Sequence, residues 1–300
     1  MLGSVAGERA RSLREVAGAY VNLTKPRIIL LLIVSTIPAM ILAEGGLPSF
    51  WLMLATVGGG AVMAGGANAM NCYFDRDIDG MMSRTRGRPL PAGQIEPERA
   101  ALFGVILGGA GFLVLEAFTN LLAAFLTLGA FGFYLVVYTL LLKRTTPLNI
   151  VIGGAAGAMP PVVGWAAVTG EVGLPALVLF AIVVFWTPPH FWALALNFSS
   201  DYERARVPML PVVLGEKETR RQILLHSVAL VAVSLLLSAT GATGLIYLTA
   251  AVLLGGVFIL FAVRLWRGTA ARASAALFRY SILYLGLLFA AVAVDALAGV

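Results

Sequence analysis

Nine long apolar runs divide this chain of 300 residues, and they constrain its fold more than any other feature. A helix that crosses a membrane needs about 20 consecutive, mostly apolar residues. The runs lie at roughly 28–46, 50–73, 100–117, 120–142, 148–168, 174–197, 222–240, 243–263 and 278–299. Only 12% of the residues are charged, whereas soluble domains carry about 25%. An ordinary soluble enzyme is therefore excluded, and we expect an all-α integral membrane protein with nine transmembrane helices.

All 21 Lys and Arg residues fall on one side of the membrane in this arrangement. They occupy the N-terminal segment 1–27 and the connections after the second, fourth, sixth and eighth runs. Because Lys and Arg collect in cytoplasmic loops, we expect segment 1–27 to be cytoplasmic and the chain to lie in a prokaryotic inner membrane. The net charge of +6 then reflects topology and contact with anionic membrane lipid, and we expect no nucleic-acid partner.

The two longest cytoplasmic connections begin with the same pattern. Asn71 is followed at the fourth position by Asp75, and Asn197 is followed in the same way by Asp201. Basic and proline residues come after both motifs. Similar segments with Lys, Thr and Pro precede the first and the fifth apolar run. This similarity indicates an internal duplication that places the two motifs at the same depth, facing a shared cavity.

The expected domain organisation follows from this duplication. After the cytoplasmic segment 1–27 we expect one domain over residues 28–300. It would consist of two four-helix repeats and a ninth helix, at about 24–142, about 143–263 and about 278–299.

The spacing of the first motif places its polar residues on one helical face. Residues four apart on a helix are neighbours, so Asn71, Asp75 and Asp79 point in one direction, and Asp77 points away. We expect Asp77 to be a salt-bridge partner. Like charges at this spacing repel each other, so helix stability does not explain Asp75 and Asp79. The alternative is that these carboxylates only solvate a cytoplasmic loop beside arginines.

Together the two motifs form a set of oxygen ligands. Mg²⁺ prefers carboxylate, amide and phosphate oxygens, so we expect a magnesium site formed by Asn71, Asp75, Asp79, Asn197 and Asp201. Basic residues near these motifs would bind phosphate groups. The candidates for binding a diphosphate are Lys25, Arg27, Arg84, Arg86, Arg88, Lys143, Arg144 and Arg206.

The first motif and the segment after it, SRTRGRPLPAG, resemble the UbiA superfamily of intramembrane prenyltransferases. Further stretches are similar to the branch that acts on heme, namely Gly153–Trp165, Trp186–Ala195 and Val207–Pro211. The resemblance is close over about 20–215. It implies nine helices around a central cavity, a Mg²⁺ cofactor and a polyprenyl diphosphate donor.

The resemblance also implies an activity, which is transfer of a farnesyl group from farnesyl diphosphate to a vinyl group of protoheme IX. In such an enzyme Asp75, Asp79, Asp201 and Lys143 would be catalytic, because they would hold the metal and neutralise the leaving diphosphate. The protein partners that the resemblance allows are heme-handling or oxidase-assembly proteins. Two alternatives remain: a sister prenyltransferase with an aromatic acceptor such as 4-hydroxybenzoate, and a repeat-containing membrane transporter.

The chain departs from the superfamily pattern at two positions in the second motif. Ala205 stands where many members carry a second aspartate, which leaves fewer metal ligands on this side. Arg206 stands where the heme branch is expected to have glycine.

His190 lies in the sixth run, two turns before Asn197, and we expect these two residues to share a face with Asp201. An ionisable residue inside a span suggests a function, and imidazole can ligate heme iron or act as a base. The alternative is a neutral histidine bonded to a backbone carbonyl freed by Pro188 and Pro189.

Overall fold

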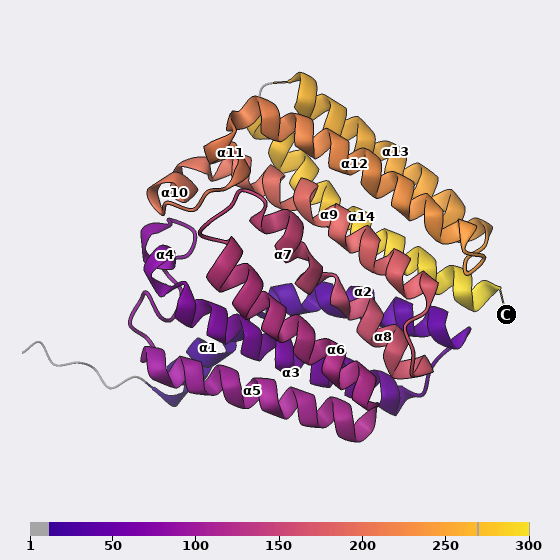
Figure 1. Ribbon diagram of the computed structural model, residues 1–300, viewed down its shortest axis with the longest axis horizontal. Coiled ribbons are helices and arrows are strands. Elements are labelled where there is room, and N and C mark those ends of the chain that lie inside the picture. Colours follow the sequence, from indigo (N-terminus) through magenta and orange to yellow (C-terminus); the bar gives the residue numbers. More distant parts are fainter. Residues whose placement is uncertain (1–11, 269, 300) are drawn as a thin grey trace, which may run out of the picture.

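A computed structural model describes residues 12–268 and 270–299 of the chain, and within them every regular element is a helix (Figure 1). The elements are α1 (Leu13–Thr24), α2 (Pro26–Glu44), α3 (Phe50–Phe74), α4 (Arg76–Met81), α5 (Pro97–Phe118), α6 (Leu121–Gly132), the π-helix η1 (Phe133–Leu142), α7 (Asn149–Gly157), α8 (Met159–Thr169), α9 (Leu174–Asn197), α10 (Ser199–Arg204), α11 (Leu210–Val213), α12 (Gly215–Ala239), α13 (Leu245–Arg267) and α14 (Ala270–Ala298). The part of segment 1–27 that covers residues 1–11 lies outside the described residues.

Nine helices in the described part of the chain are long and apolar enough to cross a membrane, as the sequence predicts. In two of them the span combines two elements, because η1 continues α6 and α8 continues α7. Two helices begin well before their apolar runs, α12 at Gly215 and not near residue 222, and α14 at Ala270 and not near residue 278. The first turns of α12 are charged but still helical, since Arg220 donates to Glu216 one turn earlier at 2.6 Å. An apolar run marks the membrane-embedded part of a helix and not its start.

Glycines allow α3 and α5 to pack closely. A Cβ atom added at Gly66 would lie 2.6 Å from the carbonyl oxygen of Gly104, and one added at Gly111 would lie 2.7 Å from that of Gly59. Small residues at such contacts let membrane helices approach until their backbones touch. Helix packing therefore explains Gly59, Gly65 and Gly66 of the second run, whereas Gly58 and Gly60 have no close neighbour.

The last helix connects the two halves of the bundle. α14 packs against α13 and α9, and also against α2 at the start of the chain (Figure 1). α3 packs on α5, and α9 packs on α12, which are equivalent positions in the two expected repeats. The duplication, and the central cavity that accompanies it, stay predictions.

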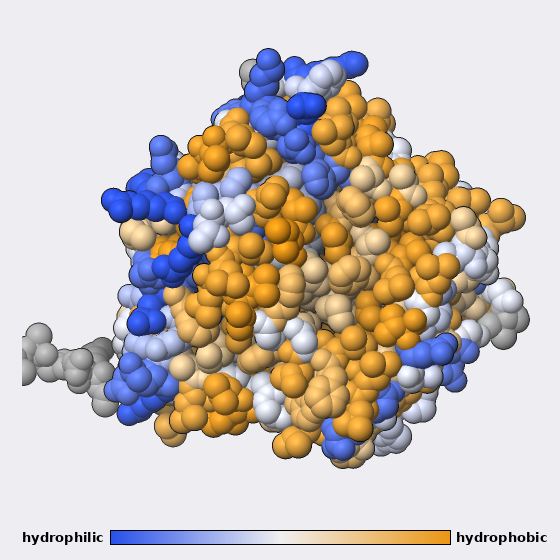
Figure 2. Space-filling view, in the orientation of Figure 1, coloured by the Kyte–Doolittle hydropathy of each residue, from blue (hydrophilic) through white to orange (hydrophobic). Residues whose placement is uncertain are grey.

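Polar residues gather at the ends of the helices. Figure 2 shows the larger hydrophilic group over α4, α10 and the start of α12, a smaller group at the opposite helix ends, and an apolar band between them. This distribution matches a bundle whose middle faces lipid.

Asp295 near the end of α14 holds the start of a neighbouring helix. Its buried carboxylate accepts hydrogen bonds from the backbone N–H groups of Gly244 and Tyr247, the latter at 3.0 Å. The first N–H groups of a helix have no partner within the helix, and a carboxylate satisfies them. Asp295 therefore joins α14 to α13.

We predict that Asp295→Ala lowers the free energy of unfolding by about 2 kcal/mol, because the buried N–H group of Tyr247 and the N–H group of Gly244 lose a charged acceptor. Thermal unfolding in detergent measures the change. Glu116→Ala, which removes an exposed carboxylate from α5, is the matched control and should leave the midpoint unchanged. Equal midpoints for the two variants would contradict this assignment.

Candidate active site

The first motif keeps its polar residues on one face, as the spacing predicts. α3 ends at Phe74, but the backbone hydrogen bonds from Asp75 N to Asn71 O and from Asp79 N to Asp75 O continue the helical pattern into α4. Asn71, Asp75 and Asp79 are all buried. The side chain of Asp77 is 57% exposed. The prediction that Asp77 faces away from the other carboxylates is confirmed.

Asn71 is the centre of a hydrogen-bond network that joins three helices. Its amide nitrogen donates to Asp75 Oδ2 at 2.7 Å and to Thr139 Oγ1 at 3.1 Å. Its amide oxygen accepts from Lys25 Nζ at 2.7 Å. Lys25 stands between α1 and α2, and Thr139 belongs to η1. One amide side chain therefore fixes the start of α2 and the end of the fourth span against α3.

Each carboxylate of the first motif is paired with a cation. Lys143 contacts Asp75, and Arg88 binds Asp79 through both carboxylate oxygens at 2.7 and 2.8 Å. Arg144 forms the expected salt bridge with Asp77 at 2.8 Å. Arg144 lowers the pKa of Asp77, chiefly through these hydrogen bonds. Carboxylates at a membrane boundary are costly without partners, and these pairs compensate for the burial.

The π-helix η1 places polar groups beside the first motif. Thr139 Oγ1 donates to the carbonyl oxygen of Tyr134, five residues earlier, while it accepts from Asn71. The rings of Tyr134 and Tyr138 stack with centroids 5.5 Å apart. Tyr138 fits because α7 has a glycine opposite it, since a Cβ atom at Gly153 would lie 2.2 Å from the ring. π-helical segments are found often at functional sites.

The second motif folds differently from the first. α9 ends at Asn197, and Phe198 has φ −128° and ψ 24°, so the chain turns before α10. Asp201 N then bonds to Phe198 O, three residues earlier, and Asp201 no longer shares a face with Asn197. Asn197 is exposed and accepts from Ser274 of α14 at 2.8 Å. The expectation that these two residues share a face is wrong, and the role of Asn197 as a ligand stays a prediction without a contact to support it.

Asp201 instead connects the two motif loops. It is buried, it contacts Arg204, and its Oδ2 accepts from both the backbone N–H and the hydroxyl of Ser83. These hydrogen bonds, with the charge of Arg204, hold the pKa of Asp201 below its usual value. Ser83 follows α4, so the loop after the first motif is attached directly to the second.

Lys25 has an unusual backbone and an unusual amine. Its φ of 53° places it in the left-handed region, where it both ends α1 and precedes Pro26 at the start of α2. Non-glycine residues in this region cost about 1 kcal/mol or more and gather at functional sites. Burial lowers the pKa of Lys25 to about 8, and the neighbouring charges of Arg88 and Lys143 act in the same direction.

The side chains of the other predicted phosphate-binding residues are exposed and, within the described residues, form no ion pair with the carboxylates of the two motifs. Arg27, Arg84 and Arg86 are exposed, and so is Arg206. Arg206 also has a left-handed backbone with φ 53°, the conformation for which glycine is best suited. Their binding roles stay predictions.

His190 is buried in α9 against α14. Its Nδ1 lies 2.7 Å from the hydroxyl of Ser281, so the backbone carbonyl of the alternative interpretation is not its partner. The ring stacks between Trp186 and Phe278. His190 and Asn197 do share the face of α9 that contacts α14, whereas Asp201 does not.

The carboxylates fit a magnesium ion that is held partly by its substrate. Within the described residues no group of three or more His, Cys, Asp and Glu side chains is placed to hold a metal by itself. Asp75 Oδ1, however, is buried and accepts no hydrogen bond, and the guanidinium of Arg144 lies 3.9 Å from it. Mg²⁺ typically takes one or two carboxylates and completes its shell with water and phosphate oxygens. The donor set around Asp75 suits this kind of site.

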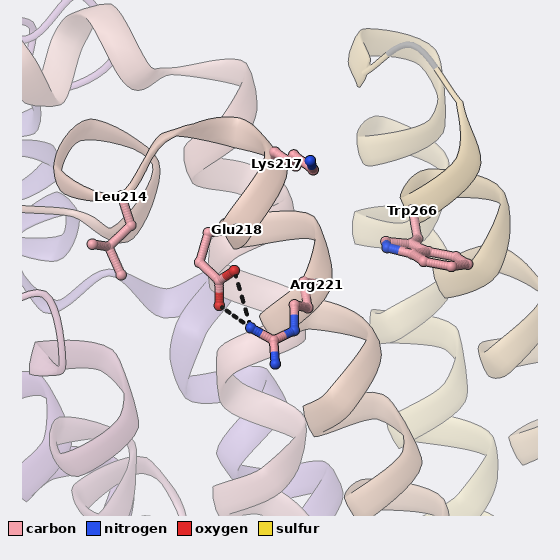
Figure 3. Close-up of a pocket in the computed structure, with 5 residues that line it drawn as sticks. All are labelled: Leu214, Lys217, Glu218, Arg221 and Trp266. Carbon is pink, nitrogen blue, oxygen red and sulfur yellow. Dashed lines mark hydrogen bonds and ion pairs between the residues drawn. The ribbon is translucent and has the colours of Figure 1, made fainter.

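A surface pocket elsewhere has no part in this site. Figure 3 shows it between α12 and α13, lined by Leu214, Lys217, Glu218, Arg221 and Trp266. Arg221 is already paired there with Glu218 at 3.3 Å. None of these residues touches the carboxylates of the two motifs in the contacts described above.

Sequence reasoning missed the neutral groups of the site. Thr139, Ser83 and Ser281 bond directly to Asn71, Asp201 and His190. A single serine or threonine forms no spacing pattern in the sequence that would identify it as functional. Only the fold brings these hydroxyl groups to their partners. A signal existed for Ser83, which begins the segment SRTRGRPLPAG, and for Thr139, which precedes the Lys143–Pro147 segment by one helical turn.

Comparison with known proteins gives one family and one fold. The model of the UbiA prenyltransferase family matches residues 32–291. A protein named protoheme IX farnesyltransferase from Chloroflexus aurantiacus is 53% identical over 98% of this chain. The chain spans about half the length of that relative (50%). One named protoheme IX farnesyltransferase 1 from Saccharopolyspora erythraea is 53% identical over 95% of this chain and 92% of its own length.

Two solved structures share the fold at low sequence identity. One, described as digeranylgeranylglyceryl phosphate synthase, has a TM-score of 0.78 and 20% identity, covering 95% of this chain and 99% of that one. The other is a UbiA homolog from Archaeoglobus fulgidus bound to GPP and Mg²⁺, with a TM-score of 0.63 and 16% identity. It covers 91% of this chain and 99% of its own.

We predict that Asp75→Ala and Asp79→Ala each lower turnover at least ~100-fold, because each removes a buried carboxylate of the first motif. Asp77→Ala, which breaks an exposed ion pair, should change turnover less than about threefold. Steady-state rates of purified variants that unfold at similar temperatures measure both effects. A loss for Asp77→Ala as large as that for Asp75→Ala would contradict the face assignment.

We predict that diphosphate binding weakens about tenfold as the pH rises through about 8, because Lys25 is protonated below its pKa and loses its charge above it. Lys25→Arg keeps a charge across this range and should remove the alkaline loss. Titration calorimetry with farnesyl diphosphate from pH 6.5 to 9.5 measures it. The same decline in both proteins would assign the titration to another group.

Proposed function

This chain belongs to the UbiA prenyltransferase family, and on that basis we propose that it transfers a farnesyl group from farnesyl diphosphate to a vinyl group of protoheme IX. The observation that carries the proposal is the buried face of Asn71, Asp75 and Asp79, surrounded by amines and a guanidinium. Carboxylates and cations in one cluster suit a metal diphosphate. The names of relatives at about half identity support the heme acceptor.

The cations would bind the diphosphate as it leaves. Lys25 and Lys143 already lie within hydrogen-bond distance of Asn71 and Asp75, and Arg88 lies on Asp79. With a metal diphosphate bound, Asp75 and Asp79 would hold the metal, and Lys25, Lys143 and Arg88 would bind phosphate oxygens. Stabilising the negative charge that develops on the diphosphate would be the main catalytic effect.

We propose Mg²⁺ as the cofactor, held by Asp75 and Asp79 with Asn71 and with Asp201 across the site. Bound there, it would act as a Lewis acid that neutralises diphosphate oxygens. Asp75 Oδ1, which is buried and accepts no hydrogen bond, supports this assignment. The fold neighbour with GPP and Mg²⁺ supports a prenyl diphosphate as the donor class.

The proposed reaction balances with one water molecule. The C1–O bond of farnesyl diphosphate breaks, and the diphosphate keeps the electron pair. The heme vinyl group supplies the electrons for a new C–C bond to C1, and water adds to the resulting cation with loss of one proton. The products are diphosphate, a proton and a heme that carries a hydroxyethylfarnesyl group, which is heme O. His190 is the residue we assign to the acceptor.

Two alternatives are less well supported. A sister enzyme with an aromatic acceptor such as 4-hydroxybenzoate would share the carboxylate site, but the names of the close relatives do not favour it. A transporter would need its polar groups near the middle of the bundle. The carboxylates here follow the ends of the second and sixth spans, and the family is one of prenyltransferases.

The chain is an integral membrane protein, and we propose that its first described helix and both motif loops face the cytoplasm. The positions of all Lys and Arg residues in alternate connections support this orientation. In a bacterium the membrane would be the inner one. Heme-handling or oxidase-assembly proteins are the partners we propose, since the acceptor is poorly soluble and must be delivered and passed on.

The test measures diphosphate release by the purified protein with farnesyl diphosphate, Mg²⁺ and heme, with mass spectrometry of the porphyrin product. We expect release only when all three are present, and none after chelation. Heme is replaced by 4-hydroxybenzoate in a parallel reaction. Release with the phenol and not with heme would favour the sister enzyme, and release with neither would overturn the prenyl transfer.

A further inference from the structure

The face of α9 that contacts α14 carries a second polar cluster, which the diphosphate site does not use. Trp186 Nε1 donates to the carbonyl oxygen of Ser281 at 2.7 Å, and His190 Nδ1 lies 2.7 Å from the Ser281 hydroxyl. All three residues are buried. Their placement makes one serine of α14 the partner of two aromatic side chains of α9.

The hydrogen bonds of Ser281 determine which imidazole nitrogen carries the proton. A hydroxyl has one hydrogen to donate, and Ser281 Oγ donates it to the carbonyl oxygen of Phe278 at 2.7 Å. Both 2.7 Å contacts of this hydroxyl are hydrogen bonds only when Nδ1–H donates to it, because the carbonyl oxygen of Phe278 cannot donate. A neutral imidazole has one N–H group, which leaves Nε2 with a free lone pair.

The surroundings of the ring agree with a neutral imidazole in a fixed plane. In the described part of the chain no carboxylate contacts His190, and an unpaired imidazolium inside a span would be costly. The ring stacks on Trp186 with centroids 4.3 Å apart and planes 18° apart. It stacks on Phe278 at 4.7 Å and 25°.

Nε2 is the only atom of this ring that remains available for a ligand. Across the described residues it makes no hydrogen bond, and it is not among the enclosed side-chain atoms that lack a partner. His190 keeps 8% of its surface exposed. A histidine whose Nδ1–H is held by an acceptor and whose Nε2 is free is the arrangement that proteins use to bind a metal.

We infer that Ser281, together with Trp186 and Phe278, positions His190 so that its Nε2 lone pair ligates the iron of a porphyrin acceptor. The inference deepens the proposed function and rests on it. Ser281 is a positioning residue here, because it acts on the acceptor only through His190. The chemistry selects an iron porphyrin over a phenol, since a phenol has no atom that needs such a ligand.

The first experiment measures the tautomer without any heme. The chain has two histidines, so His226→Gln leaves His190 as the only one. In that background, ¹⁵N NMR of protein labelled in its histidine side chain distinguishes the two tautomers. We expect the Nδ1–H form, and a shift towards Nε2–H when Ser281→Ala is added. An Nε2–H signal in the parent protein would overturn the inference.

The second experiment measures heme binding in purified protein by titration of the Soret absorbance. We expect His190→Ala to remove the histidine-ligated spectrum and added imidazole to restore it. Ser281→Ala should weaken heme affinity about tenfold, as loss of an orienting partner does at metal-binding histidines, and Ser281→Thr should recover most of it. Farnesyl diphosphate binding should be unchanged in all of them.

Ser227→Ala is the matched control, because Ser227 is equally buried but bonds only to the backbone of its own helix. Equal heme affinity in Ser281→Ala and Ser227→Ala would overturn the positioning role. If neither the parent protein nor any variant bound heme, the proposed function would be overturned, and with it the ligation of heme iron by His190. An Nε2–H tautomer in a protein that binds and farnesylates heme would overturn this inference alone.

Discussion

The site depends on one constraint, which is that carboxylates buried at the edge of a membrane need cations beside them. Asp75 is fully buried, and Lys143 and Asn71 satisfy one of its oxygens. Removing one partner of such a pair typically costs about 3–5 kcal/mol. Lys25 and Arg88 complete the arrangement on Asn71 and Asp79.

These pairs determine how the surrounding elements are placed. Lys25 reaches Asn71 from a left-handed residue between α1 and α2, and Thr139 reaches it from a π-helix. Both are costly local conformations that the network holds in place. The same groups form a preassembled site in which Lys25, Arg88 and Lys143 exceed the two buried carboxylates by one positive charge.

The sequence was sufficient for the features that repeat along the chain. Nine apolar runs and the alternation of cations predicted the spans. The spacing of four residues predicted that Asn71, Asp75 and Asp79 share one helical face. Backbone hydrogen bonds continue through Asp75, so the helical argument holds there. It fails at Asp201, because the turn at Phe198 depends on tertiary contacts such as Ser83. The π-helical register of Thr139 and the pairing of Ser281 also have no periodic signal.

The last helix has a further consequence for how the protein is made. α14 supplies the partner of His190 and the cap of α13, and it packs on both α9 and α2. It is also the last of the nine described spans to leave the ribosome. Until it inserts, the first eight spans hold the carboxylates of both motifs but leave His190 without its serine. A chain interrupted before α14 would therefore hold the proposed diphosphate site but lack the proposed acceptor site, so the order of translation delays their combination until α14 has been made.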